Sequence, residues 1–357
     1  MCNRPLPLKP QSPAMSDPSS GVASPEVPSR RPSGPPPPLP VTVLTGFLGA
    51  GKTTLLNALL ADPALSDTAV LINEFGEIGL DHLFVREVQD GVVLLASGCV
   101  CCTVRGDLVV ALEDLLRGRD NNRLPPFSRV LIETTGLADP APIVATLQND
   151  PWLKSHVRLA SIVTVVDGVA GSTNLASHPE ARRQLSLADT VIVTKTDMRA
   201  SQAFDTIVDA VRCHSPDARI FNAQDPDYLA HDVFGGAGTP AEGLDPVAFE
   251  DVERHSEDLS SFTIRMTETL DWPAFTLWLS ALLHAHGDRI LRVKGLLKTS
   301  SSDTRLAVHG VQHVMHPPVH LEADHGTESY LVFITRGIEK AVISASLRRT
   351  IAWCAHQ

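Results

Sequence analysis

The sequence predicts an α/β fold class, in which a doubly wound, mainly parallel sheet is followed by a smaller α+β domain. Two observations predict it. Short apolar runs alternate with helical stretches through residues 41–222, and these runs are continuous in Val, Ile and Leu. A parallel strand buried on both faces requires such a continuous run, and the strand–helix alternation produces a doubly wound sheet. Beyond residue 258 strands and helices follow in a different order, which is typical of α+β domains.

Apolar runs give the expected strands, and the stretches between them give the expected helices. Strands of the parallel sheet are expected at 41–45, 69–72, 92–95, 129–132, 161–166 and 190–193. Helices are expected near 52–61, 107–117, 141–148, 180–187 and 200–212. In the second domain we expect strands at 262–266, 290–297, 305–314 and 330–335, and helices at 272–286 and 338–352.

Composition divides the chain further. Residues 1–40 contain 13 of the 27 prolines, and such a Pro/Ser-rich stretch buries too little apolar surface to offset its ordering entropy. We therefore expect 1–40 to be a disordered leader. Residues 223–258 include a glycine-rich run and are expected to be a linker between a domain at 41–222 and a C-terminal domain at 259–357.

The charge and hydropathy of the chain exclude several classes of partner. The formal net charge is -11, which argues against binding to nucleic acid or to an anionic membrane surface. No apolar run approaches the roughly 20 residues that cross a bilayer, and the amino terminus has no apolar segment typical of a secretory signal. We expect a cytoplasmic protein with neither nucleic-acid nor membrane partners.

Three of the six cysteines stand together, at Cys99, Cys101 and Cys102. Neighbouring cysteines are poor disulfide partners, and in a reducing compartment such a cluster more often binds metal or does redox chemistry. Thiolates favour Zn²⁺, and the same ligands bind Co²⁺. Three sulfurs leave a tetrahedral position open, for which Glu77, a histidine or a client protein are the alternatives.

A glycine-rich loop directly follows the first predicted strand. Gly46 and Gly51 are separated by four residues and followed by Lys52 and Thr53, which is the spacing of a phosphate-binding loop. The glycines let backbone N–H groups converge on phosphate oxygens, the lysine faces the β- and γ-phosphates, and the threonine hydroxyl faces Mg²⁺. The candidate nucleotide-binding residues of this loop are Gly46, Gly49, Ala50, Gly51, Lys52, Thr53 and Thr54.

Two further strand ends carry polar residues that fit a nucleotide site. Glu133 ends an apolar run where nucleotide hydrolases place the acid that organises Mg²⁺, and Gly136 permits close approach to the γ-phosphate. We therefore expect Lys52, Thr53 and Glu133 to act in catalysis. The segment 194–197 matches the element with which GTPases recognise guanine. Its candidate residues are Thr194, Lys195 and Asp197, whose carboxylate can accept hydrogen bonds from the guanine ring.

Five segments in order resemble the CobW-like GTPases, a family of P-loop metallochaperones that includes cobalamin-synthesis relatives and zinc-regulated activators. The segments are 45–54, 73–81, 98–102, 133–140 and 194–197, and 289–295 and 310–313 resemble the family's C-terminal domain. The resemblance implies a P-loop GTPase that converts GTP to GDP and phosphate, with metal held at the Cys-x-Cys-Cys loop for a client metalloprotein. It also implies a nucleotide-responsive switch that comprises Asn73, Glu74, Gly76, Glu77 and Asp81.

Other interpretations stay open at this point. The metal is either zinc or cobalt, and the chain is either a monomer or a homodimer. A P-loop kinase that uses ATP, and a passive metal buffer, are the competing functions. The histidines between residues 309 and 325 form either a metal-acquisition surface or an ordinary surface; they are His309, His313, His316, His320 and His325.

Overall fold

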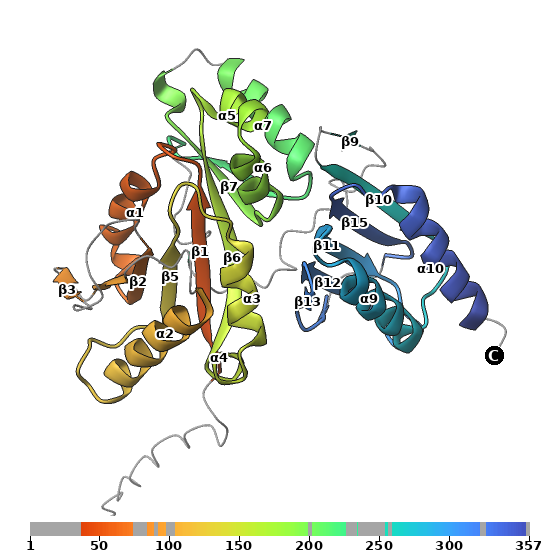
Figure 1. The fold of residues 1–357 in the computed structure, drawn as a ribbon, viewed down its shortest axis with the longest axis horizontal. Coiled ribbons are helices and arrows are strands. Elements are labelled where there is room, and N and C mark those ends of the chain that lie inside the picture. The colour runs from red at the N-terminus through yellow and green to blue at the C-terminus, as the bar shows by residue number, and fades with distance from the viewer. Residues whose placement is uncertain are drawn as a thin grey trace, which may run out of the picture. The chain divides into compact units, whose positions relative to one another are not determined.

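The first sheet of the computed structural model has eight strands in the order β3-β4-β2-β5-β1-β6-β7-β8 (Figure 1). Neighbouring strands are parallel except β3 and β4, which are antiparallel. The predicted doubly wound, mainly parallel sheet is therefore confirmed. The strands are β1 (Leu39–Gly46), β2 (Thr68–Asn73), β3 (Phe84–Val88), β4 (Val92–Ser97), β5 (Arg129–Glu133), β6 (Val157–Asp167), β7 (Thr190–Thr194) and β8 (Arg219–Asn222).

The structure describes residues 37–73, 84–88, 92–97, 104–198, 202–225, 234, 254–255, 259–321 and 326–354. The expected leader at 1–40 and linker at 223–258 fall mostly outside these residues.

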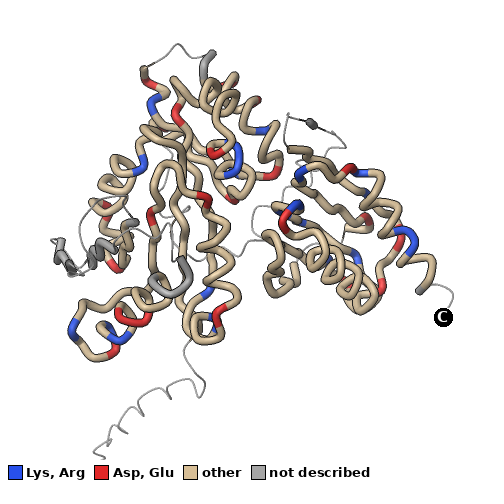
Figure 2. Tube along the Cα trace, viewed as in Figure 1, with Lys and Arg blue, Asp and Glu red and all other residues tan. Residues whose placement is uncertain are grey.

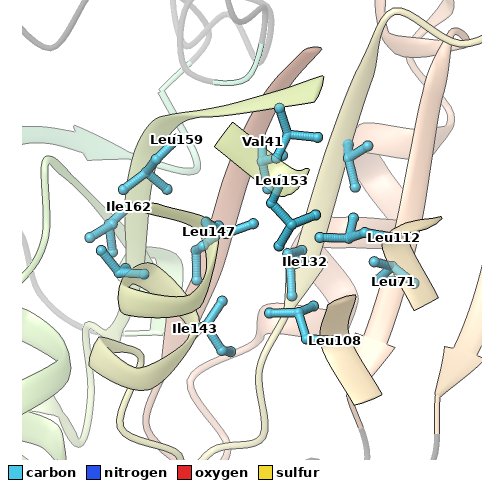
Figure 3. Packing of buried hydrophobic residues seen from close by; sticks show 14 of the residues in the cluster. Val41, Leu71, Leu108, Leu112, Ile132, Ile143, Leu147, Leu153, Leu159 and Ile162 are labelled. Carbon is cyan, nitrogen blue, oxygen red and sulfur yellow. The ribbon is translucent and has the colours of Figure 1, made fainter. Parts of the chain in front are cut away.

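Helices cover both faces of the first sheet. The helix α1 (Lys52–Leu60) packs through Leu55, Leu56 and Leu59 against one face. The opposite face is covered by α2 (Val104–Asp120), α3 (Ala141–Asn149) and α4 (Pro151–His156), and Figure 3 shows Leu112, Ile143 and Leu147 converging on strand residues. Strand residues alternate between the two cores: Val41 and Val43 face α2 and α3, whereas Leu44 faces α1. Beside β7 lie α5 (Gly171–Ser177), α6 (Pro179–Ser186) and α7 (Gln202–His214).

The C-terminal sheet is antiparallel, with seven strands: six in the order β13-β12-β11-β15-β10-β9, and β14 paired with β12. Its buried side chains pack against α9 (Trp272–His286) and α10 (Lys340–Cys354), so the predicted α+β architecture is confirmed. The strands are β9 (Arg254–His255), β10 (Ser260–Met266), β11 (Ile290–Leu297), β12 (Leu306–Val311), β13 (Val314–Met315), β14 (Val319–His320) and β15 (Ser329–Thr335).

The structure differs from the sequence-based expectation in several elements. The strand expected over 305–314 divides into β12 and β13, because Gln312 has a φ of 52° and opens a turn between them. The expectation missed β3 and β8, which are short, and the two helices α4 and α5.

In the part of the chain that the structure describes, no helix is both long enough and apolar enough to cross a membrane. Figure 2 shows acidic and basic positions interspersed along that part, as on α2, where Arg117 pairs with Glu113 at 2.9 Å.

Candidate nucleotide site at the carboxyl edge of the sheet

The carboxyl ends of the parallel strands share one edge of the first sheet. The strand register pairs Leu44 with Glu133, Ile72 with Glu133, and Asp167 with Thr194. Polar residues and glycines therefore gather where β1, β5, β6 and β7 end. In open α/β sheets, ligands bind in the crevice outside this edge, so the edge is the candidate site.

The loop after β1 has the backbone conformation that its glycines predict. Gly46, Gly49 and Gly51 all have positive φ, at 146°, 72° and 94°. A side chain on Gly46 would collide with the backbone carbonyl of Val165 in β6, so a glycine is required there. The loop leads directly into α1, whose first-turn N–H groups point toward the candidate phosphate position.

Lys52 lies under this loop and bonds to it. Its Nζ donates to the carbonyl oxygen of Gly46 at 2.8 Å and is 3.5 Å from that of Phe47. Burial lowers the pKa of Lys52, and the nearby Glu133 carboxylate opposes that shift. A phosphate anion in the loop would act in the same direction as Glu133 and favour the charged form of Lys52.

Thr53 and Glu133 meet at the centre of the site. The Thr53 hydroxyl donates to Glu133 Oε1 at 3.2 Å, although 80 residues separate them along the chain. A hydroxyl and a carboxylate are ligands that Mg²⁺ accepts, directly or through water, in nucleotide hydrolases. The donor set therefore fits the expected magnesium ion, which Thr53 and Glu133 would hold directly or through water.

The segment after β5 lies against the phosphate-binding loop. The Thr134 hydroxyl donates to Thr45 Oγ1 at 2.8 Å, and a Cβ on Gly136 would lie 2.8 Å from the backbone N and Cα of Leu48. Gln184 of α6 fixes this segment: it is fully buried, and its Nε2 donates to the carbonyls of Gly136 at 3.1 Å and Ala138 at 3.0 Å. Sequence reasoning missed Gln184, because nothing in its local pattern marks it.

The segment after β7 lies on the other side of the loop. Thr194 Oγ1 donates to the Ala50 carbonyl at 2.6 Å, and Lys195 Nζ donates to the Gly49 carbonyl at 2.7 Å. Asp197 lies exposed in the 3₁₀ turn Thr196–Met198, where its carboxylate is open to a base.

Two polar residues at or just after the end of β8, Asn222 and Gln224, were not expected at the site. The Thr196 hydroxyl donates to Asn222 Oδ1 at 2.7 Å and is 3.0 Å from Gln224 Oε1. The segment after β8 therefore borders the expected base position. Because the sequence did not predict β8, it did not predict that Asn222 and Gln224 lie next to Thr196.

The remaining site predictions lie outside what the structure describes. Cys99, Cys101 and Cys102 fall there, as do Glu74, Gly76, Glu77 and Asp81 of the expected switch, and Asn73 is described only as the last residue of β2. Among the described residues, no group of three or more His, Cys, Asp or Glu side chains is arranged to hold a metal ion.

The histidine-rich stretch lies only partly at the surface, because His313 and His320 are exposed whereas His309 is buried. His309 is only 5% exposed, and its ring stacks on that of His316 with 4.4 Å between centroids. His313 bonds instead to the Leu283 carbonyl and to Asp288. The expectation of a surface residue is therefore wrong for His309, because a neutral imidazole can pack in a core. His325 lies outside the described residues.

These observations define a nucleotide-binding protein with the P-loop GTPase fold. The model of the CobW/HypB/UreG nucleotide-binding domain matches residues 40–222, and that of the cobalamin synthesis protein cobW C-terminal domain matches residues 259–351. The chain therefore belongs to the CobW/HypB/UreG family.

Similar proteins carry names that concern zinc. The zinc chaperone YjiA of Escherichia coli K12 is 32% identical over 287 residues, which are 78% of this chain and 87% of that protein. The zinc-regulated GTPase metalloprotein activator 1 of Schizosaccharomyces pombe is 39% identical over 177 residues, 48% of this chain and 42% of that protein. The crystal structure of the Zn(II)-bound YjiA GTPase from E. coli superposes with a TM-score of 0.69 at 27% identity, covering 88% of this chain and 99% of that one.

Proposed function

We propose that this protein is a GTP-hydrolysing metallochaperone of the cytoplasm. It converts GTP and water to GDP and phosphate, and it uses the nucleotide state to control a transition metal, for which zinc is proposed, held at Cys99, Cys101 and Cys102. The metal is then delivered to a client metalloprotein. The names of the two relatives, a zinc chaperone and a zinc-regulated GTPase metalloprotein activator, support the cargo and the nucleotide. The matched residues 40–222 and 259–351 support a division into a GTPase domain and a C-terminal domain.

The observation that carries the proposal is the meeting of Thr53 and Glu133 at 3.2 Å beside the buried ammonium of Lys52. Attack of water on a γ-phosphate needs positioning and charge neutralisation more than a strong base. In this arrangement Lys52 would neutralise phosphate charge, and Thr53 and Glu133 would hold the magnesium ion, the latter through its bound water. The ion itself supplies further neutralisation of the phosphate oxygens when bound.

Guanine is the proposed base because Asp197 is the exposed carboxylate at the end of the 194–197 segment. A carboxylate accepts hydrogen bonds from the ring N–H and the exocyclic amine of guanine, and adenine does not present that pair of donors. Replacing Asp197 with Ala is expected to weaken GTP binding more than ATP binding, because charged hydrogen bonds contribute roughly 1.5–3 kcal/mol each. Equal losses for the two nucleotides would favour an ATP-using kinase.

Metal control is proposed from the order of the strands. β2 and β4 are adjacent and parallel, and their register pairs Asn73 with Ser97 at the carboxyl edge. The expected switch follows Asn73, and the cysteine loop begins two residues after Ser97. Both segments therefore follow strands that end at the edge carrying the phosphate-binding loop, and from this edge the γ-phosphate is proposed to act on the thiolates.

The test is a titration of the purified protein with Zn²⁺, and in parallel with Co²⁺, in its GDP state and with a non-hydrolysable GTP analogue. We expect the analogue to raise metal affinity at least about tenfold, and metal to tighten the analogue by the same factor, because coupling is reciprocal. Replacing Cys101 and Cys102 with Ser is expected to abolish both effects while metal-free GTP binding persists.

Two outcomes would redirect the proposal. Equal metal affinity in both nucleotide states, together with no phosphate release, would favour a passive metal buffer. Tighter coupling to Co²⁺ than to Zn²⁺ would make cobalt the cargo, for cobalamin or cobalt-enzyme assembly.

A further inference from the structure

Asp167, the last residue of β6, is a buried carboxylate whose two oxygens have different partners. It is 7% exposed. Oδ1 accepts from the backbone N–H groups of Val169 at 2.7 Å and Ala170 at 3.0 Å, and so closes the turn that follows the strand. Oδ2 accepts from Lys195 Nζ at 2.7 Å. One oxygen therefore stabilises local backbone, and the other holds a side chain from the segment after β7.

Lys195 connects this carboxylate to the phosphate-binding loop. Its ammonium donates both to Asp167 and to the Gly49 carbonyl, each at 2.7 Å. The neighbouring Thr194 pairs with Asp167 in the strand register, and its hydroxyl donates to the next carbonyl of the loop, that of Ala50. Three segments far apart in the sequence are thus joined through a single ammonium group.

We propose that Asp167 is a positioning residue for nucleotide binding, which holds the Lys195 ammonium on the Gly49 carbonyl. In this role it sets the geometry of the phosphate-binding loop relative to the base-binding segment 194–197. The inference rests on the proposed function and deepens it, because it makes phosphate and base recognition depend on one ion pair.

The electrostatics of the pair are consistent with this role. Burial raises the pKa of Asp167, but the hydrogen bond from Lys195 and those from the two backbone amides outweigh it, so the pKa lies below its usual value. The carboxylate is therefore ionised at neutral pH. The Lys195 side chain is 35% exposed, and without the counter-charge its flexible stem would regain rotamers that leave Gly49.

Replacing Asp167 with Asn tests the roles of the two carboxylate oxygens separately. The amide keeps an acceptor for the Val169 and Ala170 N–H groups, but it presents an uncharged –NH₂ group to Lys195. A matched control is Asp150, whose Oδ1 accepts from the Trp152 and Leu153 N–H groups at 2.9 Å. Asp150 caps the first turn of α4, which precedes β6. Asp150→Asn makes the same chemical change at a turn on the other edge of the sheet.

The experiment measures affinity for a fluorescent GDP, kcat and KM for GTP, and urea unfolding of the nucleotide-free protein. The variants are D167N, D167E, K195M, the double variant D167N/K195M and D150N. We expect D167N and K195M each to weaken GDP binding by about tenfold, with the double variant close to K195M alone because the two residues act through one contact. KM for GTP should rise in D167N while kcat changes less than about threefold, and D167E, which keeps the charge, should recover part of the affinity.

The variants distinguish a residue that positions Lys195 from one that only closes a turn. D150N should bind GDP as the wild type does, and D167N should unfold no more easily than D150N. If D167N binds GDP within about twofold of wild type, or if the losses of D167N and K195M multiply in the double variant, Asp167 is only a turn residue. If the wild type itself binds GDP no better than ADP, the proposed GTPase function fails, and this inference fails with it.

Discussion

Lys52 is held by carbonyl groups of its own loop. Its bond to Gly46 and its short distance to Phe47 point the ammonium at the curve of the loop. A phosphate oxygen is a stronger acceptor for this ammonium than the carbonyls, because it brings a full charge where they bring a partial one. The residue acts on the ligand more than on the fold.

Replacing Lys52 with Ala is expected to abolish phosphate release while the protein stays folded. The ammonium is the cation that faces the β- and γ-phosphates in this loop, and the alanine keeps helix propensity at the start of α1. Phosphate release under saturating GTP measures the first effect, and far-UV circular dichroism measures the second. Turnover near the wild-type rate would remove the phosphate-binding assignment.

Gln184 gives a second prediction, because its side chain holds the segment after Glu133. Replacing it with Met keeps the volume but leaves the Gly136 and Ala138 carbonyls without their buried donor. Leaving a buried polar group unsatisfied costs about 1–3 kcal/mol, so we expect a loss of unfolding free energy of about this size. We also expect kcat for GTP to fall more than nucleotide affinity, as this segment borders the γ-phosphate position. Urea unfolding and steady-state kinetics measure the two; an unchanged kcat would mean that the segment holds its position without Gln184.

Elements with long apolar runs could be predicted from the sequence, and short or half-buried ones could not. β6 contains the run Ser161–Val166 that predicts it, whereas β8 has only Ile220 and Phe221 as apolar residues and is half-buried throughout. The site divides in the same way. Lys52 and Thr53 are marked by fixed spacing in a local motif. The roles of Gln184 and Asp167 depend on contacts made 48 and 28 residues away, which no local pattern encodes.

The loops after β1 and β5 pack so closely that one added methyl group is expected to weaken nucleotide binding. Gly136→Ala places a Cβ 2.8 Å from backbone atoms of Leu48, which cannot move aside as a flexible side chain can. We expect GTP affinity to fall at least about tenfold, since the phosphate-binding loop must shift by a few tenths of an ångström or more. Gly118→Ala in α2 is the control, because there the added methyl meets only side-chain atoms of Leu124. Equal nucleotide affinity of both variants would show that the Leu48 backbone yields easily.

At the scale of the whole molecule, buried charges join the two sheets. Asp189 and Asp217, which precede β7 and β8, receive Arg292 and Lys294 from β11, with Arg292–Asp189 at 2.5 Å and Lys294–Asp217 at 3.1 Å. Arg292 is 1% exposed. Apolar side chains of the C-terminal sheet, including Leu291 and Ile334, pack in the same core cluster as α2 and α3 of the first sheet.

Two histidines complete this buried cluster. The stacked rings of His309 and His316 lie beside it, and His309 has no hydrogen-bond partner for either ring nitrogen among the described residues. Burial lowers the pKa of His316 to about 4, with Asp189 opposing the shift and Arg292 and Lys294 adding to it. The pKa of His309 also lies well below its usual value, mainly because the ring is buried and secondly because His316 is beside it. Both rings are therefore neutral in the folded protein.

These shifts predict that the protein loses stability as the pH falls from about 6.5 to about 4, the interval between the unfolded pKa of histidine and the folded value for His316. In that interval the unfolded chain binds protons that the folded chain excludes, and each such histidine adds up to about 1.4 kcal/mol per pH unit to the slope. His316→Gln is expected to reduce the slope by about one proton, and so is His214→Gln in α7, where burial and Arg182 lower the pKa to about 4. The carboxylates Asp189 and Asp217, whose pKa values are lowered by the same cations, begin to lose their contribution at about pH 5 and lose most of it below about pH 4, so the histidines dominate the slope in the upper part of the window. Urea unfolding at half-unit steps between pH 4.5 and 7.5 measures the slope. A slope that His316→Gln leaves intact would mean that this ring accepts a proton in the folded protein, and that the charges joining the two sheets tolerate another cation beside them.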